Sequence, residues 1–262
     1  MNPATLTTRA ARAARAAIGA LALCAAATSG VLAQGKAQPP AVDPAAMQLL
    51  RRSTEYVGSL KQFSAEARNH REDLLASGHR VDYYMGGRLS WRRPDKYFAQ
   101  RVGSRVEQEL YFDGKTLTLF NPPENVYASR KVSGGFPQMF TFAYDSLGLF
   151  VPMTDLVWPD VFPLLTKDVR YAAVIGKEVI SGVRCTHLLF SRPGVDFQVW
   201  VADSGPPFPY QYIVTDNGTP ERLSIVTTIT SWKAESALAD RMFTFVPPKG
   251  ASAVTFLKPL GD

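Results

Sequence analysis

Any catalytic chemistry in this sequence depends on few reactive side chains. The chain has three histidines, His70, His79 and His187, and two cysteines, Cys24 and Cys185. Cys185 and His187 are two residues apart, so on a strand they would share a face and could act as a nucleophile and its base. No third residue that would orient the histidine is evident from the sequence, which favours a packed pair of core residues.

Other catalytic and metal-binding arrangements do not occur in the sequence. No two histidines have the spacing of zinc ligands, and Cys185 by itself cannot build a thiolate site. Asp155 and Asp160 come nearest to a pair of catalytic acids, but helix caps or exposed loop positions account for them. The chain also lacks a Gly-x-Ser-x-Gly turn, a Ser-x-x-Lys pair and a phosphate-binding glycine loop. We therefore expect no enzyme, no metal site and no cofactor.

The first residues are typical of an export signal. Three arginines come first, then an apolar run over residues 16–27, and then the small-residue site at 31–33. The arginines are Arg9, Arg12 and Arg15. This order is that of a signal peptide, so we expect residues 1–33 to be removed by cleavage after Ala33.

Cys24 leaves an alternative open. It stands in the string Leu-Ala-Leu-Cys, which is similar to a lipid-attachment site, but Leu23 occupies a position that calls for a small residue. The expectation is therefore cleavage after Ala33, and a lipid anchor at Cys24 is the alternative. No later apolar run reaches the roughly 20 residues of a membrane-spanning helix, so we expect the mature chain to be soluble in the periplasm.

Composition narrows the classes of partner. The net charge of +6 includes the three arginines of the expected signal peptide, and the other charges are interspersed, so we expect no nucleic-acid partner. After cleavage only Cys185 remains, which excludes an internal disulfide. Residues 34–42 have no periodic pattern and are expected to be a flexible leader, and residues 43–262 are expected to be a single domain.

A helix is predicted at the start of this domain. Asp43 is a suitable N-cap, and Pro44 suits the first helical position. Apolar residues then recur on one helical face, at Met47, Leu50, Tyr56, Val57 and Leu60. We predict a helix over about residues 44–58.

From Phe63 the pattern changes to the period of two residues that is typical of strands. The clearest case is residues 80–92, where one face is apolar and the other is largely charged. Residues 106–112 lead into the hairpin signal Asp113-Gly114, and a return strand follows.

Residues 138–167 interrupt the strands with apolar residues at mixed helical spacings, which predicts two or three short helices. Gly176-Lys177 is among the turn signals of the part that follows. Strands are predicted there at about 169–175, 183–191, 195–202, 208–216 and 222–232. The connections are too short for helical crossovers, so neighbouring strands are expected to pair antiparallel.

This order of elements predicts a mainly β (α+β) protein. We expect one curved antiparallel sheet whose concave apolar face is covered by the N-terminal helix and the helical insert. A β-sandwich would explain the strands equally well, but it explains the apolar insert less well.

Three strings resemble the LolA/LolB lipoprotein-carrier superfamily and occur in that family's order. They are residues 87–98 (GRLSWRRPDKYF), 112–117 (FDGKTL) followed by Asn121-Pro122, and 243–250 (FTFVPPKG). Within the superfamily, the chain is most similar to an uncharacterised branch of predicted periplasmic proteins. The strings that carry this second resemblance are 185–190 (CTHLLF), 196–201 (DFQVWV) and 230–232 (TSW).

The resemblance implies a fold and a function. Its carriers are unclosed barrels with helices as a lid over an apolar cavity that accepts acyl chains. It therefore implies a periplasmic binding or carrier protein for an apolar envelope ligand, such as a lipid or a lipoprotein. A relative with the same fold senses misassembled envelope components, so an envelope sensor or assembly partner that binds protein is the alternative.

Strand parity supplies candidate ligand-binding residues. The apolar side chains on the expected concave face of the two clearest strands are Tyr83, Met85, Leu89, Trp91, Leu117 and Leu119. Phe142 of the insert could face them as part of the lid. Ordinary core packing explains any one of these residues equally well.

Arg93 is expected on the same side as Trp91, whereas Arg88 and Arg92 fall on the polar side. A charge directed at an apolar face needs a partner. In the resembling carriers the arginine of this Arg-Pro motif hydrogen-bonds to the helical lid, which implies a latch between Arg93 and carbonyls of the insert around 138–166. A strand-end arginine that points to water is the alternative, and Arg92 is expected to matter little.

Overall fold

The structure is a computed structural model that describes residues 41–147, 158, 160–234 and 237–256. The expected signal peptide at 1–33, its cleavage site, the alternative anchor at Cys24 and most of the leader lie outside the described residues. Within the described ranges, no helix has both the length and the apolar character needed to cross a membrane.

The leading helix is α1 (Pro44–Ser59), which confirms the helix predicted at 44–58. Asp43 caps it, because its Oδ1 accepts a hydrogen bond from the Ala45 backbone N–H at 2.8 Å. The buried face of α1, centred on Leu50, packs against the sheet. Tertiary packing of this kind supplies most of the stability of a helix in a protein.

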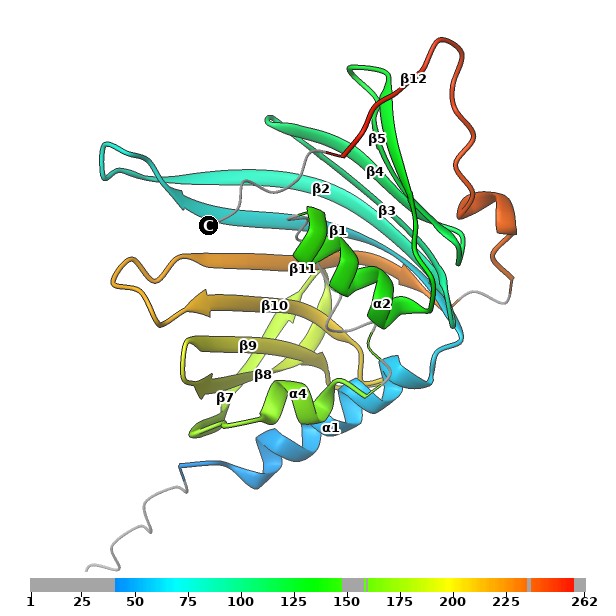
Figure 1. Cartoon of the computed structure of the whole chain (residues 1–262). Coiled ribbons are helices and arrows are strands. Elements are labelled where there is room, and N and C mark those ends of the chain that lie inside the picture. The colour runs from blue at the N-terminus through cyan, green and yellow to red at the C-terminus, as the bar shows by residue number, and fades with distance from the viewer. Residues whose placement is uncertain (1–40, 148–157, 159, 235–236, 257–262) are drawn as a thin grey trace, which may run out of the picture. The chain divides into compact units, whose positions relative to one another are not determined.

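The sheet of the described residues has twelve strands in one curved layer (Figure 1). They are β1 (Gln62–Leu74), β2 (Arg80–Arg92), β3 (Lys96–Gly103), β4 (Val106–Phe112), β5 (Thr116–Asn121), β6 (Val126–Lys131), β7 (Tyr171–Ile180), β8 (Val183–Arg192), β9 (Val195–Ala202), β10 (Pro209–Asp216), β11 (Ser224–Lys233) and β12 (Ser252–Ala253). β1 to β6 form one meander and β7 to β11 a second, and the two join where β1 pairs with β11. Because β12 and β7 end the sheet without meeting, it is not closed into a barrel.

Within each meander, consecutive strands pair antiparallel, as predicted. The short β12 differs, because it pairs parallel with β6. The predicted mainly β architecture with an open, curved, antiparallel sheet is therefore confirmed.

The helical insert lies between the two meanders in the sequence and on one face of the sheet in space. Its helices are α2 (Phe136–Thr141), η1 (Phe142–Ser146) and α4 (Phe162–Thr166), on the same face as α1 (Figure 1). We call this covered face the inner face. Short helices in the insert are therefore confirmed, while residues 148–157 and 159 lie outside the described part.

Two separate clusters of buried side chains form the core on the inner face. The first lies on β11 and β1 to β5, beneath α2 and the C-terminal end of α1, and includes Phe63 and Trp91. The second lies on β8 and β9 beneath α1 and α4 and includes Leu50 and Leu188. Tyr212 of β10 packs against both clusters. The core is thus divided along the sheet.

The turn predicted at Gly176-Lys177 is wrong. β7 continues through both residues, with a change of register against β8 between Val174 and Gly176. The chain turns instead at Ser181-Gly182, where φ is 48° and 80°. A glycine inside a strand marks a bulge as readily as a turn, so the sequence pattern alone did not distinguish the two.

The segment that leads to β12 lies on the outer face of the first meander. Phe243 is fully buried there, beside Leu238 and aromatic residues of the sheet. Arg92 donates a hydrogen bond to the Leu238 carbonyl oxygen at 2.6 Å and pairs with the Asp240 carboxylate. Contrary to expectation, Arg92 is therefore not an idle surface charge, because strand alternation does not reveal what covers the outer face.

Candidate functional site

The inner face carries two rows of mostly apolar side chains across four neighbouring strands. Register pairs the members of one row, Trp91, Tyr97, Phe112 and Leu117, from strand to strand. It pairs the members of the adjacent row, Leu89, Ala99, Leu110 and Leu119, in the same way. Side chains that lie directly opposite in a sheet are in contact, so the predicted concave-face residues of two hairpins form one surface.

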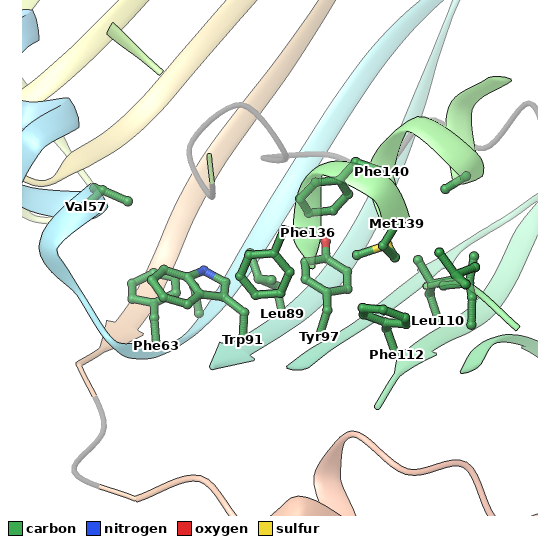
Figure 2. Close-up of a cluster of buried hydrophobic side chains, with 14 of the residues drawn as sticks. Val57, Phe63, Leu89, Trp91, Tyr97, Leu110, Phe112, Phe136, Met139 and Phe140 are labelled. Carbon is green, nitrogen blue, oxygen red and sulfur yellow. The ribbon is translucent and has the colours of Figure 1, made fainter. Parts of the chain in front are cut away.

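The α2 helix covers the first of these rows (Figure 2). The Phe136 ring makes edge contacts with Trp91 and Tyr97, with ring centroids 6.4 Å apart in each pair. Phe140 contacts Tyr97 at right angles, with centroids 5.4 Å apart. Such aromatic pairs contribute about 0.5–1.5 kcal/mol each beyond the area they bury, so rings hold this part of the insert on the sheet.

The structure places most of the predicted ligand-binding residues in one cluster. Leu89, Trp91 and Leu117 are buried members, and Leu119 and Phe142 pack against them while partly exposed. Phe142 begins η1 and so lies in the insert, where a lid residue was expected. Ligand binding by these residues stays a prediction.

Tyr83 and Met85 lie outside this cluster. Both are half-buried and sit further along β2 on the same face as Trp91. The Arg105 guanidinium lies 4.4 Å from the centre of the Tyr83 ring. Strand alternation therefore predicted the face of Tyr83 and Met85 correctly. It did not show that α2 covers only the other end of β2.

Two polar atoms near the covered rows are buried and have no hydrogen-bond partner among the described residues. They are the Tyr97 hydroxyl and Nη2 of Arg93. Burial, and then the nearby Tyr212, raise the pKa of the Tyr97 hydroxyl above its usual value. A buried polar group without a hydrogen-bond partner lowers the stability of the fold by about 1–3 kcal/mol. A ligand that supplied a partner at either atom would remove this cost, so its complex with the protein would be stabilised.

Arg93 lies on the apolar side, as predicted, with its guanidinium carbon 4.8 Å from the centre of the Trp91 ring. Its Nε donates a hydrogen bond to the carbonyl oxygen of Leu60, the C-cap of α1, at 3.0 Å. Burial lowers the pKa of the guanidinium. Within the described part, Arg93 is thus tied to the leading helix, and its latch to the insert stays a prediction.

Small residues lie in the middle of the inner face. Ala67 is opposite Ile229 on one side and Gly87 on the other, and Gly87 is opposite Arg101. A Cβ at Gly87 would lie 2.7 Å from the Gln100 carbonyl oxygen, so the backbone itself requires glycine there. Partly buried apolar side chains pack against the first cluster from strands on both sides of this point, among them Ala67, Ala99, Leu119, Tyr210 and Tyr212. We call these five residues the border of the first cluster.

His187 has partners that the sequence did not reveal. Its Nδ1 lies 3.1 Å from Glu178 Oε1, and its Nε2 lies 2.8 Å from Gln198 Oε1. The imidazole stacks on Trp200 with ring centroids 3.9 Å apart. Both hydrogen-bonding partners come from the strands beside β8, which only the pairing of the sheet brings together.

The Cys185 thiol has the properties of a core residue. It is fully buried, and its Sγ donates to the Val183 carbonyl oxygen at 3.4 Å. Burial, and then the Asp203 carboxylate, raise the pKa of the thiol to about 11. A nucleophilic cysteine needs a lowered pKa, so this thiol is poorly suited to attack. Of the two acids considered above, Asp160 is exposed and Asp155 lies outside the described residues.

Sequence reasoning missed Tyr97, Arg101 and Phe136. Tyr97 and Arg101 belong to the return strand after Pro94, and pairing across that turn from Trp91 would have placed both on the inner face. Phe136 precedes the predicted insert, and nothing in its local pattern sets it apart from a loop residue.

Comparison with solved structures finds several similar chains, and a search of curated proteins finds no match. An uncharacterised conserved protein from Thermus thermophilus is 10% identical, with a TM-score of 0.47, and the match covers 80% of this chain and 99% of that one. LprF from Mycobacterium bovis is 13% identical, with a TM-score of 0.42 and coverage of 81% and 100%. A LolA superfamily protein from Nitrosomonas europaea is 14% identical, with a TM-score of 0.38 and coverage of 76% and 97%.

The family comparison covers most of the chain. The family model described as a predicted periplasmic protein matches residues 46–257. This is the kind of uncharacterised periplasmic branch that the strings at 185–190, 196–201 and 230–232 indicated. The chain therefore belongs to the DUF2092 family of predicted periplasmic proteins.

Proposed function

We propose that the protein is a periplasmic binding or carrier protein for an apolar envelope ligand, such as a lipid or the acyl chains of a lipoprotein, and that it acts without catalysis. The observation that carries this proposal is the divided core of the inner face. Two clusters are packed separately, and the border residues of the first cluster, of which Tyr212 also packs against the second, stay partly exposed. Removing apolar surface from water is favourable by about 25 cal/mol per Å². A bound apolar ligand would gain this free energy by covering the exposed part of the border.

The unpaired polar atoms support the same proposal. The Tyr97 hydroxyl and Arg93 Nη2 have no hydrogen-bond partner among the described residues, although both atoms are buried. An ester or head-group oxygen of a lipid could accept a hydrogen bond from either of them.

The compartment forms part of the proposal. The family description names the periplasm, and we propose that residues 1–33 direct export and are cleaved after Ala33, with lipid attachment at Cys24 as the alternative. Intact-mass analysis of the exported protein separates the two. A mass that begins at Cys24 and carries lipid would contradict the cleavage.

A second candidate function is binding of an envelope protein at the edge strand β7. Its side chains Ile175 and Val179 are 51% and 68% exposed, although both are large and apolar. An edge strand with exposed apolar residues can accept a strand from a partner.

Native mass spectrometry of the mature protein isolated from the periplasm tests the first candidate. We expect adducts whose masses correspond to acyl-bearing molecules and which organic solvent removes. Protein without such adducts, which also takes up no added lipid, would contradict the carrier function. A protein adduct in their place would favour the second candidate.

A pair of variants tests where the ligand lies. Ala67→Trp places an indole at the border of the first cluster, whereas Arg68→Trp places the same indole on the exposed outer face of β1. We expect Ala67→Trp to lose the adducts and Arg68→Trp to keep them, with circular dichroism confirming that both fold. Equal adducts in both variants would show that the ligand lies elsewhere.

A further inference from the structure

Two arginines share the inner face beyond the end that α2 covers. Arg101 follows Tyr97 and Ala99 by strand alternation and lies opposite Gly87. Arg71 lies opposite Tyr83 on β1, on the same face. Since glycine has no side chain, the neighbouring position on β2 leaves room beside Arg101.

Arg101 is half-buried without an acidic partner. Its Nε donates to Gln108 Oε1 at 3.0 Å, and its Nη2 donates to the same oxygen. Among the described residues, no carboxylate lies within ion-pair distance of its guanidinium. A neutral amide oxygen compensates a partly desolvated charge less well than a carboxylate does.

Arg71 adds a second positive charge to the same region. Burial, and then the charge of Arg71, lower the pKa of Arg101, so the two guanidinium groups repel each other. The nearest acid to Arg71 is Asp73, with 3.9 Å between Arg71 Nη2 and Asp73 Oδ2, and the Arg71 side chain is 54% exposed. A weak, exposed pair of this kind leaves most of the charge of Arg71 uncompensated.

Apart from Asp73, which strand alternation places on the same face as Arg71, the nearby acids point away from the inner face. Strand alternation puts Glu107 and Glu109 on the outer side of β4, where Glu109 accepts hydrogen bonds from Gln100 and Tyr111. Two like charges therefore lie on an inner face that has few acids of its own. An anion is the group that would relieve both their repulsion and their desolvation.

Apolar side chains connect these arginines to the covered cluster. The row next to Arg101 contains Ala99 and Leu110. On the other side of Gly87, Met85 is the next residue of β2 on the inner face. A ligand whose apolar chain lay on the border of the first cluster would therefore bring its end close to Arg101.

We infer that Arg101 and Arg71 bind the anionic head of an amphipathic ligand, a carboxylate or a phosphate attached to an apolar chain. The inference rests on the proposed function and narrows it to anionic amphiphiles. Arg101 makes the main contact with the anionic head, because it is the more buried of the two arginines. Arg71 supplies the second positive charge at the more exposed side.

Fluorescence titration with cis-parinaric acid and its uncharged methyl ester tests the inference, because the two probes share one chain and differ in the head. We expect the mature protein to bind the acid about tenfold more tightly than the ester at about pH 8, where a carboxylate is ionised. Arg101→Gln is expected to remove this preference by weakening binding of the acid alone. Arg101→Lys, which keeps the charge, is expected to retain part of it.

Arg68→Gln is the matched control, since it removes one positive charge from the exposed outer face of β1. Equal binding of acid and ester by the wild type, or an equal loss of preference in Arg68→Gln and Arg101→Gln, would overturn the inference and leave the proposed function intact. Binding of neither probe would overturn the proposed function, and the inference with it.

Two further probes distinguish the chemistry of the head. Displacement of cis-parinaric acid by a phosphatidic acid, but not by a diacylglycerol with the same chains, would extend the site to phosphate heads. Displacement by inorganic phosphate alone at a similar concentration would contradict the role of the apolar chain.

Discussion

The two ends of the inner face share one sequence pattern and differ in what covers them. At the covered end, Trp91 is 1% exposed beneath α2. At the uncovered end of the same strand, Tyr83 is half-buried, and its ring lies 4.4 Å from the Arg105 guanidinium. Both residues have the same parity on β2, so strand alternation cannot distinguish a core position from an uncovered one. The position of the insert makes that difference.

The comparison also separates stability from binding. Side chains at the covered end contact many others, so their loss leaves a cavity in a packed cluster. Side chains at the uncovered end, such as Met85, contribute little to that packing and remain available to a ligand. We therefore expect substitutions at the two ends to affect different measurements.

The largest expected effect is on the stability of the covered end. Trp91→Ala should lower the free energy of unfolding by about 3–5 kcal/mol, because it removes a fully buried indole from the first cluster. Tyr83→Ala should lower it by less than about 1 kcal/mol and should instead weaken ligand binding. Urea unfolding of both variants measures the difference, and similar losses in the two would abolish the distinction between the ends.

A smaller effect is expected where Arg93 joins the covered end to α1. Arg93→Leu removes the hydrogen bond to the Leu60 carbonyl oxygen and the contact with the Trp91 ring, which together contribute about 1–2 kcal/mol. It should also loosen the helices over the inner face and raise binding of an environment-sensitive apolar dye.

Arg88→Leu is the control for this prediction, because Arg88 is exposed on the outer face of the same strand. Arg92 is unsuitable for that purpose, since it holds the 237–256 segment. If wild type, Arg93→Leu and Arg88→Leu all fold and bind the dye equally, Arg93 is no latch.

The smallest effect concerns the Tyr97 hydroxyl and depends on pH. Its folded-state pKa lies above the ordinary value of 10.0, mainly through burial, so the neutral form is favoured in the fold. The corresponding stability is present below about pH 10 and is lost as the pH rises further, because the unfolded chain ionises first. Tyr97→Phe should change stability little at neutral pH and should make its alkaline decline less steep. A decline as steep as that of the wild type would contradict the role of Tyr97.

Much of the fold could be predicted because its signals are local. The Asp43 cap, the alternation through β2 and the Asp113-Gly114 hairpin each reflect the backbone chemistry of a few adjacent residues. The turn at Gly176 was wrong for the same reason, since a bulge and a turn place similar local demands on glycine.

The candidate site was less predictable because it depends on partners far apart in the sequence. The contact of Arg93 with Leu60, and that of Arg92 with Leu238, each join segments that no local pattern relates. The two clusters form only once α1, α2 and α4 pack on the sheet, and these helices come from separate parts of the sequence. The family resemblance indicated the architecture, but parity alone could not rank the residues of the inner face.

The seam between β1 and β11 has a consequence for folding. Each meander consists of hairpins between neighbouring strands, whereas the seam pairs the two halves of the chain. Thr227 donates a buried hydrogen bond to Asn69 at 2.8 Å across the seam, although the two residues are 158 positions apart. Closing so long a loop costs conformational entropy, and only the contacts of the completed sheet offset that cost. We therefore expect the seam to form late in folding.

Until that step, β1 and β11 both present open edges. An exposed strand edge can pair with another chain, so the partly folded state is the one at risk of self-association. If the protein crosses the inner membrane unfolded, each molecule passes through this state in the periplasm before its inner face exists.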